Sequence, residues 1–337
     1  MSKVIIGIHG LGNKPSKEIL KEWWETSIKE GLIAIGKPQL DFDFKMIYWA
    51  DVFHEKPLDE HISDKNDPLY LTEKYVPASM NDIPEEHPFR QKVLDIVEKQ
   101  LDSIFLNEDL TINFSGIADS IIHRYFKELD YYYSIDNPDS GNPDINARNV
   151  IRMRVLKELD HHINDDIMLI GHSMGSIIGY DVINYITNEI DIDTFVTIGS
   201  PLGFPVIMGK IAADRNIFLP KLNKLKTPEA VRKNWYNLSD LEDMIALIYR
   251  LSENFDANNR GIQVTDLIVH NNYEINGEKN PHKSFGYLRT PQMARIIYNF
   301  MVTEKMNVFR RIKKRWKKLT RFYRKRLTKN YDLKIMN

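Results

Sequence analysis

The chain of 337 residues is 42% hydrophobic and carries a formal net charge of −1 at pH 7, which is typical of one large or two smaller globular domains. It contains no cysteine, which excludes disulfides and thiolate metal sites. It also lacks an apolar run of about 18 residues and a leader-like N-terminus. We therefore expect no transmembrane helix and no signal peptide, and we expect a cytoplasmic protein.

The first fifty residues alternate between strands and a helix. Residues 3–9 (KVIIGIH) predict a buried strand that runs into a flexible loop at 9–12 (HGLG). Pro15 and the serine after it form a helix-start signal, and we expect a helix that Gly31 closes. Residues 42–49 (FDFKMIYW) then predict the second strand.

Residues 52–145 interrupt this alternation. The stretch is rich in proline and aspartate, and it holds two amphipathic patterns that predict helices over 89–105 and 117–129. We interpret it as a cap or lid inserted into the core, and the alternative is a packed helical subdomain that does not contact substrate. The predicted organisation is a core (1–51 and 146–303), a helical cap insertion (52–145) and a basic tail (304–337).

The second half of the chain returns to strands and helices. The expected elements are a helix over 146–162, strands over 167–170, 194–199, 233–238 and 261–269, a loop-rich stretch over 200–230 and a closing helix over 290–301. This alternation predicts an α/β fold with a doubly wound, mostly parallel sheet. In such open sheets the site lies outside the carboxyl ends of the strands, so the residues after each strand should converge.

Residues 171–175 (GHSMG), here called the elbow, join the apolar strand at 167–170 to a helix. A sharp strand-to-helix turn forces Ser173 into a strained backbone conformation. It also brings strand and helix so close that a Cβ at Gly171 or Gly175 would clash. The turn lifts the Ser173 hydroxyl above the sheet at a helix N-terminus, where backbone N–H groups can hold a developing oxyanion.

A serine hydroxyl is a poor nucleophile unless a base takes its proton and a carboxylate orients that base. After Ser173, an acidic turn over 240–243 follows one predicted strand, and His282 lies in the polar loop after another. His270, at the end of that last strand, is a rival base. The order along the chain is therefore serine, acid, histidine.

The chain resembles the α/β-hydrolase superfamily, on its lipase and serine-esterase side. The matching segments are HGLG (9–12), GHSMG (171–175), TIGSPLG (197–203), WYNLSDLEDMIA (235–246) and HKSFGYL (282–288). The resemblance covers roughly residues 1–50 and 146–303, and it leaves out the insertion and the basic tail. It implies an α/β-hydrolase-like sheet.

The resemblance also implies site residues. Ser173 matches the nucleophile, His282 the base and Asp243 the acid, because the acid of such proteins is typically the second aspartate of a D-x-x-D-like turn. Asp240 remains an alternative acid, since this turn has Leu241 and Met244 where relatives often carry proline.

The implied activity is hydrolysis of carboxylic esters through an acyl-enzyme, with the backbone N–H groups of Leu11 and Met174 as the oxyanion hole. The alternatives are thioester or amide hydrolysis with the same residues, or an inactive fold that serves as a membrane-associated scaffold. We expect no cofactor and no metal, because the sequence shows no metal-ligand spacing and no phosphate-binding glycine motif. The expected partner is a small-molecule or lipid ester.

The end of the chain is strongly basic. Residues 305–329 contain thirteen Lys or Arg and no acid, and residues 330–337 are neutral, so residues 1–304 carry a net charge of −14. Apolar side chains recur in this tail at spacings of three or four, which predicts one apolar stripe on a basic helix: Phe309, Ile312, Trp316, Leu319, Tyr323 and Leu327.

This stripe is typical of a helix that lies in an anionic membrane interface, with Ile312, Trp316, Leu319 and Tyr323 facing the membrane. The hypothesis places the protein peripherally on the inner face of a membrane and makes a lipid ester its substrate. The alternative is that the stripe packs on the acidic body. Nucleic acid is the least favoured partner, because no base-reading module accompanies the basic surface.

Overall fold

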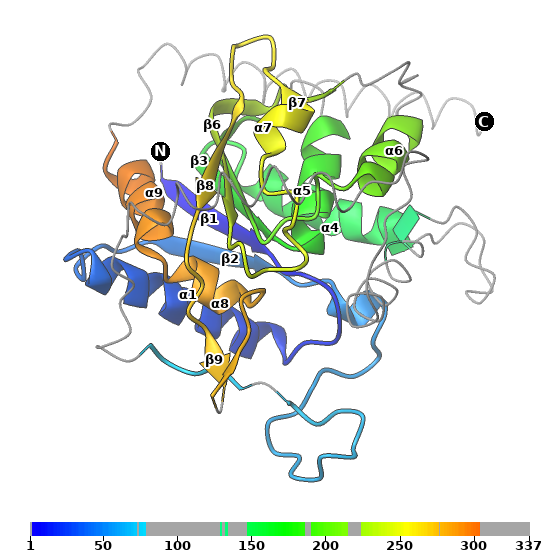
Figure 1. Cartoon of the computed structure of the whole chain (residues 1–337), viewed down its shortest axis with the longest axis vertical. Helices are drawn as coiled ribbons and strands as arrows, with labels where there is room; N and C mark the ends of the chain where they lie inside the picture. The colour runs from blue at the N-terminus through cyan, green and yellow to red at the C-terminus, as the bar shows by residue number, and fades with distance from the viewer. Residues whose placement is uncertain are drawn as a thin grey trace, which may run out of the picture.

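The centre of the computed structural model is a sheet of six parallel strands (Figure 1). The structure describes residues 2–72, 74–78, 129, 132–133, 147–185, 190–214, 224–275 and 277–303. The strands are β1 (Lys3–Ile8), β2 (Asp43–Ile47), β3 (Asp166–His172), β4 (Ile192–Ile198), β6 (Val231–Ser239) and β8 (Val264–Ile268). Their order across the sheet is β2-β1-β3-β4-β6-β8. This confirms the predicted doubly wound α/β fold.

The central strands are buried on both faces, as their unbroken apolar sequences predict. Every residue of β3 and β4 is buried, and five of the six residues of β1 are. Strands that are covered on both sides cannot alternate polar and apolar side chains, because neither face meets water. Neighbouring strands pair in register, with Ile8 opposite Gly171 and His172 opposite Ile198.

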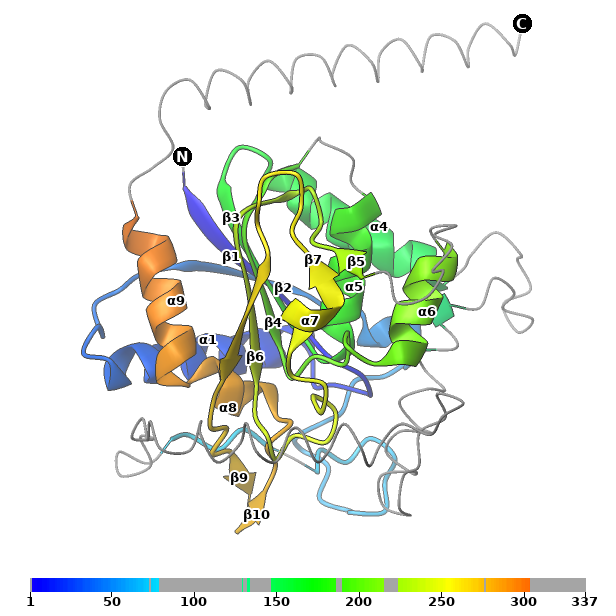
Figure 2. The same cartoon turned by 45° about the horizontal axis from the view of Figure 1, so that its top comes forward.

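Helices cover both faces of the sheet (Figure 2). On one face, α4 (Ala147–His161), α5 (Met174–Tyr185) and α6 (Pro205–Asp214) share a core with inward side chains of the strands. On the other face, α1 (Lys17–Ala34), α8 (Ser284–Leu288) and α9 (Pro291–Val302) form a second core. The sheet is therefore the middle layer of a three-layer sandwich.

The point where the strand order reverses lies between β1 and β3. The chain leaves β1 through α1 on one face toward β2, and it leaves β3 through α5 on the other face toward β4. Connections that diverge in this way leave a crevice at the carboxyl ends of the two strands, which is where ligands bind in open α/β sheets. The loop after β1 and the elbow after β3 both open into this crevice.

Short elements complete the described chain. A 3-10 helix, η1 (Ala50–Val52), follows β2, and α7 (Leu251–Asn254) precedes β7 (Phe255–Asp256), which pairs with β5 (Leu225–Lys226). A small antiparallel hairpin of β9 (Glu274–Ile275) and β10 (Glu278–Lys279) projects from the loop after β8.

Two local predictions were wrong. Gly31 does not close the first helix, because α1 continues to Ala34. A Cβ at Gly31 would lie 3.0 Å from the backbone oxygen of Arg289, so this glycine permits close packing against the end of α8 instead. The stretch 200–230 is also less loop-rich than predicted, because it contains the ten-residue helix α6.

The helices predicted at 89–105 and 117–129 and the whole tail from 304 lie outside the described residues, apart from Leu129, which is buried in the core of the α4 face. The membrane-facing residues predicted in that tail therefore stay a prediction. Within the described ranges, the structure has no helix that is long and apolar enough to cross a membrane.

Candidate active site

Ser173 occupies the elbow between β3 and α5 in a strained backbone conformation. Its φ is 57°, and it is the only non-glycine residue with a positive φ in the described part of the chain. A Cβ at Gly171 would lie 2.6 Å from the Cα of Ser176, and a Cβ at Gly175 would lie 2.2 Å from the backbone oxygen of Ile8. Both glycines are thus required by close backbone packing, and the strain at Ser173 is typical of a functional turn.

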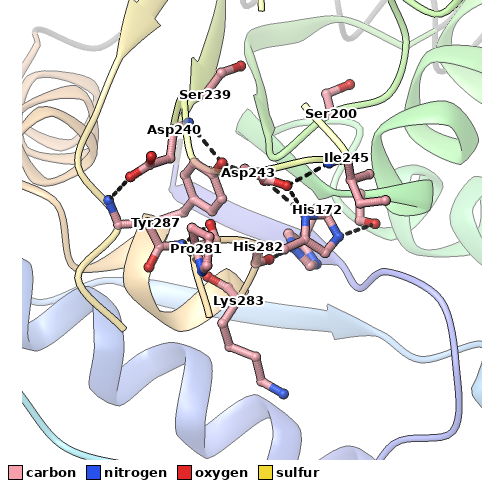
Figure 3. A network of polar contacts seen from close by, with 12 residues as sticks. His172, Ser200, Ser239, Asp240, Asp243, Ile245, Pro281, His282, Lys283 and Tyr287 are labelled. Atoms are coloured by element: carbon pink, nitrogen blue, oxygen red, sulfur yellow. Dashed lines mark hydrogen bonds and ion pairs between the residues drawn. The ribbon is translucent and has the colours of Figure 1, made fainter. Parts of the chain in front are cut away.

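Three of the predicted site residues meet at the carboxyl end of the sheet. The Oγ of Ser173 lies 2.9 Å from Nε2 of His282, and Nδ1 of His282 lies 2.9 Å from Oδ2 of Asp243. The Asp243 side chain is fully buried, whereas that of His282 is 28% exposed. The structure therefore brings together serine, histidine and carboxylate in a continuous chain of hydrogen bonds. Figure 3 shows the link between His282 and Asp243.

The Asp243 carboxylate is held by two further donors (Figure 3). The backbone N–H of Ile245 donates to Oδ1 at 2.9 Å, and the hydroxyl of Tyr287 donates to Oδ2 at 2.7 Å. Burial and the nearby Asp243 charge raise the pKa of Tyr287 well above its ordinary value, so the phenol keeps its proton and remains a donor. Sequence reasoning did not identify Tyr287, which lies within the matching segment HKSFGYL.

Asp240, the alternative acid, does not contact His282. Its carboxylate accepts the backbone N–H groups of Glu242, at 2.8 Å, and of Asn271. Nδ1 of His270 lies 3.6 Å from the same carboxylate. Asp240 and His270 thus lie in a contact of their own. The residues linked to Ser173 in the structure are His282 and Asp243, not these two alternatives.

Three consecutive backbone carbonyls around His282 are bound by side chains. The amide of Asn271 donates to the oxygens of Pro281, at 2.7 Å, and Lys283, at 2.8 Å. Nε2 of His172 lies 2.7 Å from the oxygen of His282 itself. These bonds set the position of the His282 ring from its own backbone, and Asn271 is a second residue that sequence reasoning missed.

The ring of His172 packs against the ring of His282, the base. Its ring centroid lies 4.8 Å from that of His282. Burial lowers the pKa of His172 well below its ordinary value, and the titratable ring of His282 beside it lowers that pKa further. His172 is therefore neutral and can donate its single N–H to the carbonyl of His282.

The loop after β1 is braced by His9. Nδ1 of His9 lies 2.8 Å from the oxygen of Gly10, while its Nε2 accepts the backbone N–H of Trp49 at 3.0 Å. Burial lowers the pKa of His9 to about 3, so the ring is neutral, with its proton on Nδ1. Because a trans peptide is planar, holding the Gly10 carbonyl also orients the N–H of Leu11 in the opposite direction.

The two predicted oxyanion donors flank Ser173. Met174 is the first residue of α5, so its N–H belongs to the group at a helix N-terminus that has no partner within the helix. A Cβ at Gly10 would lie 2.7 Å from the Cβ of Ser173, which places the Leu11 loop directly against the serine. The start of α5 and the loop that carries Leu11 therefore both lie beside Ser173.

Ser200, in the matching segment TIGSPLG, supports the elbow from behind. Its Oγ lies 2.7 Å from Oγ of Ser176, whose hydroxyl donates to the backbone oxygen of Ser173. The preceding Gly199 has a φ of 53°, and a Cβ there would lie 2.9 Å from the Asp243 carboxylate. This segment therefore leaves room for the acid and the base.

A pocket of about 290 Å³ opens beside Ser173 and His282. Helix α1 contributes Leu20, Trp23 and Trp24 to its apolar wall. The described start of the predicted insertion adds Leu58 and Leu71. In the ranges that the structure describes, no group of three or more His, Asp or Glu side chains could hold a metal ion.

The comparisons with known proteins are sparse. No family model matches the sequence, and no curated protein matches it. Among solved structures, the chain is similar to a "putative cell surface hydrolase" from Lactobacillus plantarum WCFS1, at 14% identity and a TM-score of 0.33, over 94% of this chain and 98% of that one. It is also similar to a lipase-esterase related protein from Clostridium acetobutylicum ATCC 824, at 12% identity and a TM-score of 0.28, over 88% and 94% of the two chains.

Both likenesses are loose and carry no argument about activity. The fold follows from this chain's own features, namely a parallel sheet in the order β2-β1-β3-β4-β6-β8 and a strained serine on the turn between β3 and α5. The chain therefore has an α/β-hydrolase-like fold.

Proposed function

We propose that the protein is a serine hydrolase that cleaves carboxylic esters. The observation that carries this proposal is the unbroken hydrogen-bond chain from Ser173 through His282 to Asp243, with distances of 2.9 Å at both links. A neutral imidazole in this position can take the serine proton while the buried carboxylate stabilises the imidazolium that forms.

The first half-reaction forms an acyl-enzyme. Oγ of Ser173 attacks the ester carbonyl as Nε2 of His282 accepts its proton, and the carbonyl oxygen becomes an oxyanion. The N–H groups of Leu11 and Met174 stabilise that oxyanion, each such donor being worth roughly 3 kcal/mol in the transition state. His282 then gives the proton to the departing alcohol, and Asp243 holds the ring in the required tautomer throughout.

The second half-reaction regenerates the serine. Water attacks the acyl carbonyl, and His282 now accepts a proton from that water. The 28% exposure of the His282 side chain supports this step, because the base must be reachable by solvent once the alcohol has left. Collapse of the second oxyanion releases the acid and returns the proton to Ser173.

Labelling with a fluorophosphonate probe tests the activated serine. We expect the wild type to be labelled and the Ser173→Ala and His282→Ala variants not to be. His270→Ala is the matched control, since this histidine also lies in the segment between β8 and α8 but is near Asp240 instead of Asp243. Circular dichroism would verify that all four proteins are folded.

The outcomes separate the candidate functions. Labelling lost in both variants and kept in His270→Ala, together with turnover of a 4-nitrophenyl ester, would support the ester hydrolase. Labelling with turnover only of thioesters or anilides would move the assignment to those substrates. A folded wild type that is neither labelled nor active with detergent or vesicles present would support the inactive scaffold instead.

We further propose, from the sequence of the tail alone, that residues 305–329 bring the enzyme to anionic membranes, where a lipid ester is the substrate. The support is the apolar stripe containing Ile312, Trp316 and Leu319 among thirteen basic residues. In flotation with anionic and neutral vesicles, we expect the full chain to bind only anionic ones. Equal binding of the full chain and a chain lacking 305–337 would contradict this proposal.

A further inference from the structure

Ser284, the first residue of α8, lies close to the base of the site. It follows His282 by two residues, so the two Cα atoms are at most about 7 Å apart. Both residues line the pocket that opens at Ser173. Ser284 is only 6% exposed, and yet it forms part of this wall. The small part of the residue that stays open therefore faces the pocket.

The hydroxyl of Ser284 makes no hydrogen bond within the residues that the structure describes. The buried serines behind the elbow differ, because the hydroxyls of Ser176 and Ser200 bind each other at 2.7 Å. The Ser284 hydroxyl is also not sealed in the core, since it is not one of the described polar atoms that are buried without a partner. It can therefore donate to a ligand in the pocket and accept from one.

A second polar group in the pocket wall also lacks a partner. Nε1 of Trp24 is buried and makes no hydrogen bond in the described chain, and Trp24 lines the same pocket. The Cε3–Cζ3 edge of this indole ring faces β1, where a Cβ at Gly7 would lie 2.8 Å from Cζ3. Nε1 is on the opposite side of the ring, away from that strand. Because buried donors are nearly always paired, two unpaired groups in one wall indicate a ligand that brings polar atoms with it.

Helix α8 holds the Ser284 hydroxyl in a fixed place. The amide of Asn271 donates to the carbonyl of Lys283 at 2.8 Å, which orients the peptide that leads into Ser284. Further along the helix, the hydroxyl of Tyr287 donates to Asp243 at 2.7 Å. The helix is therefore tied both to the acid and to the loop that carries the base. A hydroxyl fixed in this way binds a ligand atom with little loss of conformational entropy.

The neighbours of Ser284 in the pocket wall indicate which kind of group it receives. Phe285 follows it, and the ring of Phe285 packs edge-to-face on Trp23, with centroids 5.7 Å apart. Leu20 and Leu71 also line the pocket. Beside apolar side chains, a neutral oxygen is desolvated at a much lower cost than a charged group. A hydroxyl or carbonyl oxygen on an otherwise apolar chain therefore fits this wall.

We propose that Ser284 is a specificity-determining residue, whose hydroxyl binds a neutral oxygen that the substrate carries a few bonds from the scissile carbonyl. This inference rests on the proposed ester hydrolase function and specifies its substrate class, namely esters with a hydroxyl or carbonyl group on an apolar acyl or alcohol part. A site built to hydrogen-bond such a group discriminates against the analogue that lacks it, because the polar group of the site is then left unpaired.

Two pairs of esters test this selection and locate the oxygen. The first pair consists of the 4-nitrophenyl esters of 3-hydroxyhexanoic acid and of hexanoic acid, which differ by a hydroxyl on the acyl side. The second pair consists of hexanoyl glycerol and propyl hexanoate, which differ by hydroxyls on the alcohol side. The readout is the ratio of kcat/KM for the hydroxylated ester over the plain one, compared between each variant and the wild type. Intrinsic reactivity and general losses of activity cancel in this comparison.

The variants are Ser284→Ala and, as the matched control, Ser252→Ala. Ser252 is likewise in the first turn of a short helix, α7, but it is not among the described residues that line the pocket. We expect Ser284→Ala to lower the ratio about fivefold in at least one pair, as the loss of one neutral hydrogen bond requires. Ser252→Ala should leave both ratios unchanged.

Ratios that Ser284→Ala leaves unchanged in both pairs, or that the two variants lower equally, would overturn the selection. In that case labelling of Ser173 by the fluorophosphonate probe, with turnover of the plain esters, would leave the proposed hydrolase function standing. Absence of labelling and of turnover of all four esters would overturn the hydrolase function, and the selection with it.

Discussion

Two regions of the site reach the same functional arrangement by different physical means. The elbow depends on close backbone packing that leaves no room for a side chain, because a Cβ at Gly175 would lie 2.2 Å from the backbone oxygen of Ile8. The acid–base loops, residues 240–246 and 280–283, are held by hydrogen bonds from side chains outside them. Tyr287 binds the acid, Asn271 binds the carbonyls on either side of the base, and His172 binds the carbonyl of the base itself.

This difference predicts which substitutions each region tolerates. Close backbone packing tolerates almost no added atom but does not depend on any single polar group. A network of hydrogen bonds accepts changes of shape more easily, yet each lost partner shifts the groups that it holds. We expect substitutions in the elbow to act mainly on folding and substitutions around the acid–base loops to act mainly on activity.

The largest effect should come from the acid. Asp243→Asn keeps the shape of the side chain but places an amide against Nδ1 of His282, which favours the wrong tautomer of the ring. We expect kcat for a 4-nitrophenyl ester to fall about ten-thousandfold, with little change in the melting temperature. Asp240→Asn is the matched control and should lose less than about tenfold, because Asp240 does not contact His282. Equal losses in the two variants would contradict this assignment.

A substitution in the elbow should lower the stability of the protein rather than the activity of a folded enzyme. Gly175→Ala places its Cβ against the backbone of β1, and we expect the free energy of unfolding in urea to fall by more than about 3 kcal/mol, or the protein not to fold. Gly209→Ala is the control, since a Cβ there meets nothing within 4 Å. Because Gly209 lies inside α6, that change should stabilise the protein by up to about 1 kcal/mol. A stable, active Gly175→Ala protein would contradict the claim that the elbow depends on close backbone packing.

The loop beside the elbow contains His9, which should make the stability of the protein depend on pH. Burial lowers its pKa to about 3, against about 6.5 unfolded, so the unfolded state binds the extra proton between these values and stability falls as the pH falls. At pH 5 the loss relative to pH 7 is about 2 kcal/mol. We expect urea denaturation to show a smaller pH dependence for His9→Gln than for the wild type.

The control for this experiment is His61→Gln. The His61 side chain is 85% exposed, and the substitution should leave the pH dependence of the wild type unchanged. A pH dependence that is the same in His9→Gln and His61→Gln would show that His9 is not the group responsible.

The smallest effect is expected from removing the single hydrogen bond between Tyr287 and Asp243. Tyr287→Phe removes the hydroxyl that donates to Oδ2 of Asp243 and leaves the ring in place. A hydrogen bond to a charged group contributes about 1.5–3 kcal/mol, and the remaining N–H donor to Asp243 offsets part of that loss. We expect kcat to fall about tenfold. Tyr298→Phe on α9 should leave kcat unchanged, and an equal fall in both variants would point to a general packing effect.

Much of this architecture could be predicted from the sequence because its causes are local. Unbroken apolar runs predicted the buried strands, and alternation with helices predicted the parallel sheet that the structure confirms. The spacing of Gly171 and Gly175 around Ser173 predicted the elbow. These patterns depend on neighbours within a few residues, where backbone stiffness and side-chain period decide the conformation. Gly31 was misread because its reason is a contact with α8 rather than a helix end.

The sequence by itself determined the order of strands and helices, the buried central strands and the strained turn at Ser173. Only the tertiary structure decided which acid and which histidine meet, and it alone revealed Tyr287 and Asn271. The reason is distance along the chain: His282 lies 109 residues from Ser173, 39 from Asp243 and 11 from Asn271. Such contacts depend on how β6 and β8 are registered against β3 and β4, and no local pattern in the sequence encodes that register.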